Sequence, residues 1–493
     1  MLDRIFKLGK EAAIYGLSSI VGRFLNFLLV PVTTNFLATA DYGVQANIYA
    51  YIAFAFVVYG YGMDSAYMRF VVSLDTADKK QTVSVPYFSL LGTSVLFSLL
   101  IYLCAPAISG VLGVDAVHTD LIRYSGWILC FDTLAIVPFA YLRMENRAKM
   151  FAGLRILNIA INVLLTILLF VVLKMGVEAV FIANLLASAV TALVLAAIVF
   201  PQLTLRFPSG LYNEMIRFGL PYIPAGLAGI AIQVIDVPIL KALTNDATVG
   251  VYRANYRLGV LMMLVVGMFD YAWRPFFLTH AKDNDAQKLF SKVFTYFILS
   301  MMTMFLLVSL FVEDLVRIEV FGKHFFHPDY WQGVGIVPWI LLAYVFNGAY
   351  VVFLAGTYLE KKTSYLPLVT GMGALVNVVA NYVLIPPLGI SGAALATLAS
   401  YLCMAIAMYV TSQRYYPIRY EWNRVLGIAL SAAIVFALFR LAAPTPLSLS
   451  GTLIKSGLLV LFLALLPLLR VFGRAELNEL KLTFRRLTSR SSP

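Results

Sequence analysis

Long runs of apolar residues without charge follow one another along most of the chain. A helix needs about 20 predominantly apolar residues to cross the hydrocarbon core of a bilayer, and the pattern supplies fourteen such segments. They fall at residues 12–40, 42–63, 81–114, 124–142, 156–173, 179–205, 216–240, 249–275, 293–312, 330–359, 363–413 (two spans), 425–441 and 451–469. The pattern therefore predicts an all-α polytopic membrane protein.

Two of these segments predict their own interruptions. Residues 363–413 carry no charge over 51 positions, which is too long for one span. Two prolines and two glycines in Ile385–Gly392 predict a turn between the eleventh and twelfth spans. The seventh span holds Pro221, Pro224 and Pro238, so we expect that helix to be bent or broken.

Composition narrows the functional class. The 493 residues are 61% hydrophobic and 13% charged, whereas soluble proteins average roughly 25% charged residues. These values exclude a soluble enzyme, a secreted disulfide scaffold and a nucleic-acid-binding domain. The composition instead indicates the lipid bilayer as the partner of this protein, and we expect it to bind no nucleic acid. The three cysteines all lie in apolar stretches and indicate neither a disulfide framework nor a metal site.

The basic residues predict the topology. The net charge is +12, and Lys and Arg accumulate in the cytoplasmic loops of membrane proteins. With the N-terminus inside, inner segments hold 27 Lys and Arg and outer segments hold seven, so we predict that both termini are cytoplasmic. Residues 471–493 form a basic amphipathic tail suited to the anionic inner leaflet, which we interpret as a topology anchor.

An internal repeat predicts two lobes. The stretch Phe36–Gly43, continuing to Asp64, resembles Ala242–Gly250, continuing to Asp270. Each unit contains six spans, an even number, so the copies insert in the same orientation as parallel repeats, one of the layouts of transporters. The predicted organisation is two six-helix lobes, residues 1–205 and 206–415, two C-terminal spans in residues 416–470, and the tail 471–493.

Arginines within spans are candidate substrate contacts. An ionisable group in a span costs about 2.5–3.5 kcal/mol on insertion scales, so it usually faces a water-filled cavity or a partner. Arg23 and Asn26 share a face of the first span, and Arg253 and Arg257 are spaced i, i+4 in the eighth. The planar guanidinium suits a phosphate, so we predict that these four residues bind an anionic substrate between the lobes. In the alternative, Arg253 and Arg257 snorkel to the outer interface or pair with Asp236 or Asp270.

The acidic residues receive separate interpretations. Asp132 and Asp236 lie deep in spans and are candidates for proton or cation coupling. At the inner ends of the second and eighth spans, we favour helix-end ion pairs over proton coupling. These pairs are Asp64 with Arg69 and Asp270 with Arg274.

Enzymatic chemistry finds no support in the sequence. His324 and His327 have a spacing seen in metal sites, but Tyr330 and Trp331 follow them in the longest outer segment, which favours an aromatic interfacial segment. No nucleotide-binding loop, catalytic triad or pair of catalytic acids is present. We predict a protein that is not an enzyme and that needs no metal or cofactor. An ion gradient, the membrane potential or substrate flux would supply its energy.

Several motifs carry a family resemblance that extends over nearly the whole chain. The chain resembles the oligosaccharide flippases, or polysaccharide transporters, of the multidrug, oligosaccharidyl-lipid and polysaccharide exporter superfamily. The similar segments are Gly22–Pro31, Ala40–Gly43, Val249–Tyr256, Trp273–Phe276 and Leu388–Thr397.

This resemblance implies a substrate and a mechanism. Such a protein exports an undecaprenyl-pyrophosphate-linked oligosaccharide across the bacterial inner membrane by alternating access between its lobes. The cargo would be a repeat unit of O-antigen (for lipopolysaccharide), capsule or exopolysaccharide, and other polysaccharide-assembly proteins would be potential partners. The cationic cavity of the family falls by position on Arg23, Arg253 and Arg257. No motif fixes which glycan is carried.

Two alternatives remain open. A cation-coupled multidrug antiporter of the same superfamily would place acidic rather than basic residues in its cavity. A membrane polysaccharide polymerase or glycosyltransferase would carry long outer loops with catalytic acids, whereas the longest outer segment, Glu313–Asp329, has 17 residues.

Overall fold

The computed structural model describes residues 22, 25, 27, 29–73, 79–320, 322–469 and 471. Most of the first predicted span and the tail lie outside these residues, as do Arg23 and Asn26. Within the described part, thirteen helical segments are long and apolar enough to cross a membrane. They coincide with the second to fourteenth predicted spans, so the multi-pass helical architecture is confirmed for that part of the chain.

We call residues 29–202 the first lobe. It begins with a helical stretch at 29–36. Its further helices are α2 (Thr39–Gly60), α3 (Met63–Ser73), α4 (Lys79–Leu103), α5 (Ala105–Val111), η2 (Ala116–His118), α6 (Thr119–Leu134), α7 (Ile136–Met144), α8 (Ala148–Val171), α9 (Glu178–Val199) and η3 (Phe200–Gln202).

Three short helices then connect this lobe to a second one. The connecting helices are α10 (Ser209–Gly219), α11 (Tyr222–Val234) and α12 (Asp236–Leu243). The second lobe, residues 246–415, contains α13 (Asp246–Tyr256), η4 (Arg257–Gly259), α14 (Val260–His280), α15 (Ala286–Arg317), β1 (Glu319–Val320), β2 (Lys323–His324), η5 (Pro328–Ile336), α16 (Val337–Leu359), α17 (Tyr365–Leu388) and α18 (Ile390–Tyr415). The C-terminal pair is α19 (Trp422–Ala442) and α20 (Leu449–Leu468).

The predicted interruptions are present. The seventh span is divided into the three connecting helices, with Pro221 at the N-cap of α11 and both Pro224 and Pro238 in first turns, where proline is tolerated. The eleventh and twelfth spans separate at Gly389, whose φ of 57° suits glycine. A two-residue antiparallel ribbon, β1 with β2, departs from the all-α prediction.

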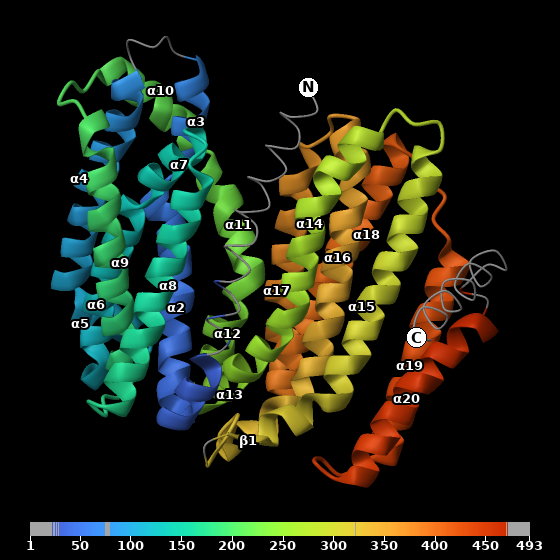
Figure 1. The fold of residues 1–493 in the computed structure, drawn as a ribbon. Coiled ribbons are helices and arrows are strands. Elements are labelled where there is room, and N and C mark those ends of the chain that lie inside the picture. Colours follow the sequence, from blue (N-terminus) through green and yellow to red (C-terminus); the bar gives the residue numbers. More distant parts are fainter. Residues whose placement is uncertain are drawn as a thin grey trace, which may run out of the picture.

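The lobes converge at one end of the molecule. In Figure 1 the two groups of helices lie close together near α13 and β1 and separate toward the opposite end, near α3 and α10. We call the first the hairpin end and the second the α10 end. The connecting helices run between the lobes: Met215 of α10 is buried with Tyr61 and Met63 of the first lobe, whereas α12 packs on α13 and α17 of the second. The predicted lobe boundary at residues 205 and 206 stays a prediction.

The outer surface is apolar. Leu368, Leu375, Val379 and Val383 recur along one side of α17 and are each more than half exposed, which is the pattern of a helix face against lipid. The C-terminal pair flanks α15 of the second lobe (Figure 1). A nearly buried ion pair between Lys455 of α20 and Asp314 of α15 fixes that contact.

Candidate functional site

At the hairpin end, α2 and α13 cross with their backbones in contact. A Cβ atom added to Gly43 would lie 1.8 Å from the carbonyl oxygen of Asp246, and one added to Gly250 would lie 1.9 Å from that of Thr39. An offset of 207 residues relates both Gly43 to Gly250 and Thr39 to Asp246. The crossing therefore follows the register of the internal repeat, and only glycine permits this approach.

Hydrogen bonds between the lobes add to this closure. The hydroxyl of Tyr330 donates to the carbonyl of Leu37 at 2.9 Å and so joins the second lobe to the first. Within the second lobe, Asn255 donates to the carbonyl of Tyr330 at 2.8 Å and holds this tyrosine in place. Asn35 donates to the carbonyl of His324 at 2.8 Å. The hairpin end is thus held by backbone packing and by the hydrogen bonds of Tyr330 and Asn35, which link the two lobes.

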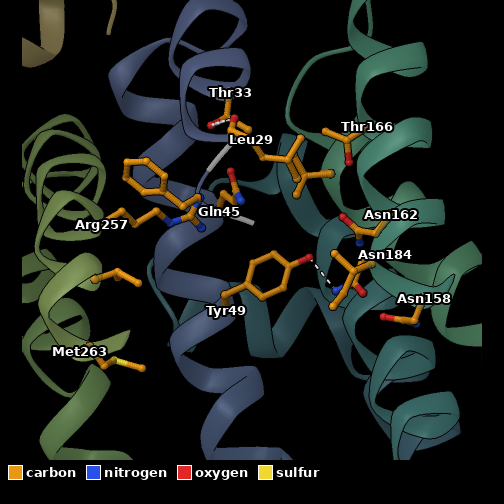
Figure 2. Close-up of a pocket in the computed structure, with 14 residues that line it drawn as sticks. Leu29, Thr33, Gln45, Tyr49, Asn158, Asn162, Thr166, Asn184, Arg257 and Met263 are labelled. Atoms are coloured by element: carbon orange, nitrogen blue, oxygen red, sulfur yellow. Dashed lines mark hydrogen bonds between the residues drawn. The ribbon is translucent and has the colours of Figure 1, made fainter. Parts of the chain in front are cut away.

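Beyond this crossing lies a polar cavity of about 390 Å³ between the lobes. Its walls come from the 29–36 helix, α2, α8 and α9 of the first lobe and from η4 and α14 of the second (Figure 2). Its polar lining residues are Thr33, Gln45, Tyr49, Asn158, Asn162, Thr166, Asn184 and Arg257.

Arg257 is the charged member of this lining among the described residues. It begins η4, a 3-10 turn between α13 and α14. Its guanidinium lies 5.5 Å from the ring centroid of Tyr42, which permits a cation–π contact. Within the described part of the chain, no carboxylate lies within 4.0 Å of it. A cation without a local counter-charge favours an anionic ligand in the cavity.

The surroundings of Arg253 differ from those of Arg257, although the spacing of the two residues predicted that their side chains point in the same direction. It is absent from the cavity lining, and its guanidinium lies 5.0 Å from the ring centroid of Tyr256. It also interacts electrostatically with Asp236, but one of its terminal nitrogens is buried without a hydrogen-bond partner among the described residues, so the predicted pairing with Asp236 stays a prediction. Contact between Arg253 and a substrate stays a prediction.

Asp236 is the centre of a buried network in the second lobe. Only 2% of this residue is exposed. Its carboxylate accepts hydrogen bonds from the hydroxyl of Tyr252 at 2.5 Å and from the backbone N–H of Val237 at 3.0 Å. The role of Asp236 in ion coupling stays a prediction.

Asp132 lies in α6 of the first lobe and is not part of the cavity lining. It hydrogen-bonds to Ser188 and interacts with Arg155. The Oγ of Ser188 also lies 3.4 Å from the side-chain oxygen of Asn184, a cavity residue, so its single proton can be donated to either group. Asp132 is therefore linked to the lining through one hydroxyl.

The predicted ion pairs at the α10 end have different environments. Arg274 donates to Asp270 at 2.8 Å and reaches the hydroxyl of Tyr358 at 3.4 Å. Arg69 lies 4.5 Å from the ring centroid of Phe218 in α10. Asp64 accepts a hydrogen bond from Ser65 at 3.4 Å. A role of these residues in closing this end stays a prediction.

His324 lies against an aromatic residue of the same outer segment, and an interfacial position of this segment stays a prediction. The ring of His324 packs edge-on against Trp331 with centroids 5.1 Å apart, and its Nδ1 lies 3.1 Å from the carbonyl of Arg317. Among the described residues, no cluster of three metal-binding side chains was found.

The neutral residues of the cavity lining were not predicted from the sequence. Asn158, Asn162 and Thr166 follow one another at i, i+4 and i+8 on α8, and Gln45 and Tyr49 are spaced i, i+4 on α2. This spacing can be recognised in the sequence, because residues four positions apart share a helix face. These side chains are uncharged, so they do not stand out in a span as Arg or Asp does.

Several solved structures share this fold at low sequence identity. The lipid II flippase MurJ, in its inward closed conformation, matches with a TM-score of 0.74 and 13% identity over 93% of this chain and 97% of that one. An inward-facing multidrug resistance MATE family transporter of the MOP superfamily matches with a TM-score of 0.63 and 17% identity, over 82% and 97%. The Vibrio cholerae MATE transporter VcmN in its bent form gives 0.56 and 14%, over 83% and 97%.

Sequence comparison identifies the family. No curated protein sequence matches the chain. A family model described as polysaccharide biosynthesis protein matches residues 8–280, more than half of the chain. This agrees with the resemblance found in the sequence motifs. The chain belongs to the polysaccharide biosynthesis protein family, and it is a multi-pass membrane protein.

Proposed function

We propose that this protein is a flippase for an undecaprenyl-pyrophosphate-linked oligosaccharide in the bacterial inner membrane. The observation that carries the proposal is Arg257, a cation without a carboxylate partner among the described residues, in a polar cavity between the lobes. A diphosphate would supply the missing counter-charge, and the planar guanidinium can donate two hydrogen bonds to it. The family, which acts in polysaccharide biosynthesis, supports the same substrate class.

Transport follows by alternating access. In the topology favoured by the basic residues, both termini are cytoplasmic and the hairpin end faces the periplasm. The crossing of Gly43 and Gly250 then closes the periplasmic side, and the headgroup enters from the α10 end. Separation of α2 from α13 would release it outward. The proline-containing connecting helices, which contact both lobes, are suited to act as the hinge.

Ion coupling, where it operates, would use Asp132 or Asp236. Asp132 bonds to Ser188, whose hydroxyl also lies near the cavity residue Asn184, and Asp236 interacts electrostatically with Arg253. Replacement of the coupling residue by Asn should abolish stimulation of transport by an imposed proton or sodium gradient while leaving gradient-independent exchange. Equal stimulation in wild type and in both variants would contradict this assignment.

The antiporter alternative is disfavoured by the lining. Among the described lining residues there is no carboxylate to hold an organic cation, and the one charge present would repel it.

The proposal is tested by complementation of a flippase-deficient strain, with protein amounts in the membrane measured in parallel. A hydrogen bond to a charged group contributes about 1.5–3 kcal/mol, so Arg257→Ala should weaken substrate binding by roughly 10- to 150-fold. Arg257→Lys should retain part of the export, because it keeps the charge without the planar fork. Arg440→Ala, at an exposed arginine in the last turn of α19, serves as the matched control and should export normally. Normal export by well-expressed Arg257→Ala would contradict the proposal.

A further inference from the structure

The cavity has two chemically different sides. Arg257 comes from the second lobe, and the neutral residues of α8 and α9 lie across the cavity from it, with Tyr49 between them (Figure 2). We call Gln45, Tyr49, Asn158, Asn162, Thr166 and Asn184 the amide face. Every member is uncharged, so the amide face offers no electrostatic attraction to a phosphate.

Part of the amide face is held in a fixed orientation. Asn184 donates to the hydroxyl of Tyr49 at 2.9 Å, and Asn158 donates to Thr191 at 3.0 Å. The ring of Tyr49 is also supported by Phe181, with centroids 5.1 Å apart. These contacts set the rotamers before any ligand arrives, which is the arrangement expected of a binding surface.

Other members have unused hydrogen-bonding capacity. The side-chain oxygen of Gln45 and the hydroxyl of Thr166 have no partner within the described part of the chain. Gln45 is 4% exposed and Thr166 is 1% exposed, and both line the cavity. Buried polar atoms are nearly always paired in proteins. These two atoms are covered in this conformation, so we expect them to gain a partner when the lining rearranges around a ligand or water in the cavity.

The chemistry of this face matches a sugar. A side-chain amide presents a donor and an acceptor in one plane, which can pair with two neighbouring hydroxyl groups. A fixed tyrosine ring adds an apolar surface beside them. A cavity of about 390 Å³ lies near the lower end of the range for ligand sites, roughly 300–1,000 Å³. It suits a sugar unit beside a phosphate rather than a whole repeat unit.

We propose that the amide face binds the hydroxyl groups of the sugar next to the diphosphate and thereby selects the glycan. This inference rests on the proposed function, since it divides one headgroup between Arg257 and the amide face. The second lobe supplies affinity for the phosphate that every substrate shares. The first lobe supplies discrimination between sugars.

The test measures binding of short-chain polyprenyl pyrophosphates to the full-length protein in lipid nanodiscs. One lipid carries no sugar, and the others carry glucose, galactose, N-acetylglucosamine or N-acetylgalactosamine. For wild type, at least one sugar should bind more tightly than the sugar-free lipid. Asn162→Leu and Thr166→Val should each remove roughly 2- to 12-fold of that increment, the range for a neutral hydrogen bond. Their affinity for the sugar-free lipid should not change.

Two controls separate the possible outcomes. Thr303→Val removes an exposed hydroxyl of α15 that only bonds its own helix, and it should change neither affinity. Arg257→Ala should weaken binding of all the lipids alike, and its failure to do so would contradict the proposed function rather than the amide face. The amide-face proposal is overturned if no sugar improves binding to wild type, or if the two amide-face variants weaken the sugar-free lipid equally.

Discussion

Substitution of Gly43 by alanine should shift the balance between the two access states. The new Cβ would lie 1.8 Å from the carbonyl oxygen of Asp246, whereas a carbon and an oxygen approach to about 3.3–3.6 Å. The α2 and α13 backbones must therefore separate by roughly 1.5 Å. The clash involves backbone on both sides, so a side-chain rotation cannot relieve it.

The expected magnitude follows from overpacking. Extra methyl groups in tight cores cost about 1–3 kcal/mol, and this penalty falls on the state in which the crossing is closed. The ratio of closed to open molecules should then decrease by roughly 5- to 150-fold. Gly250→Ala should act similarly through Thr39. The double variant should add little, because one separation relieves both clashes.

Spin-label distances across the hairpin end can measure this shift. In a cysteine-free background, labels at Lys174 and Arg440 report the separation of the two sides. Gly43→Ala should broaden or lengthen the distance distribution, and transport should decrease. Gly92→Ala is the matched control, since a Cβ at this α4 glycine meets nothing within 4 Å. A wild-type distribution in Gly43→Ala would refute the close crossing.

Two further predictions concern the C-terminal helices and the topology. Lys455 of α20 donates to Asp314 of α15 at 2.5 Å and is 1% exposed; Lys455→Met should cost about 3–5 kcal/mol and lower the thermal midpoint, and an unchanged midpoint would show that the pair does not anchor α20. In intact cells, a membrane-impermeant maleimide should label a cysteine at Thr39 and leave one at Lys361 unlabelled, and the opposite pattern would invert the topology.

Local sequence patterns predicted the spans and their breaks well. Lipid excludes charged groups, so long uncharged runs correspond directly to membrane-spanning helices. Pro221 and Gly389 influence the backbone conformation at their own positions, so the breaks in the helices could be predicted there. The internal repeat could also be recognised in the sequence, since the segments around Gly43 and Gly250 retain similar residues. Features that depend only on neighbouring residues or on the bilayer are therefore accessible from one sequence.

The arrangement of the site was less predictable. The i, i+4 spacing of Arg253 and Arg257 indicated one helix face. Arg253, however, lies over the ring of Tyr256 and interacts electrostatically with Asp236, whereas Arg257 begins a 3-10 turn and lines the cavity. The helices that face each other across the cavity are determined by contacts between lobes that are distant in sequence. Asn162 is neutral, so nothing marked it in the sequence as an unusual residue for a membrane span.

The central claim is that Arg257 and the cavity around it move a lipid-linked glycan across the membrane. The most direct measurement is translocation of a fluorescent undecaprenyl-pyrophosphate-linked oligosaccharide in proteoliposomes without ATP. We expect wild type to move the lipid, Arg257→Ala to lose this activity while remaining folded, and Arg440→Ala to behave as wild type. Equal translocation by wild type and Arg257→Ala, or translocation only when ATP is supplied, would contradict the account.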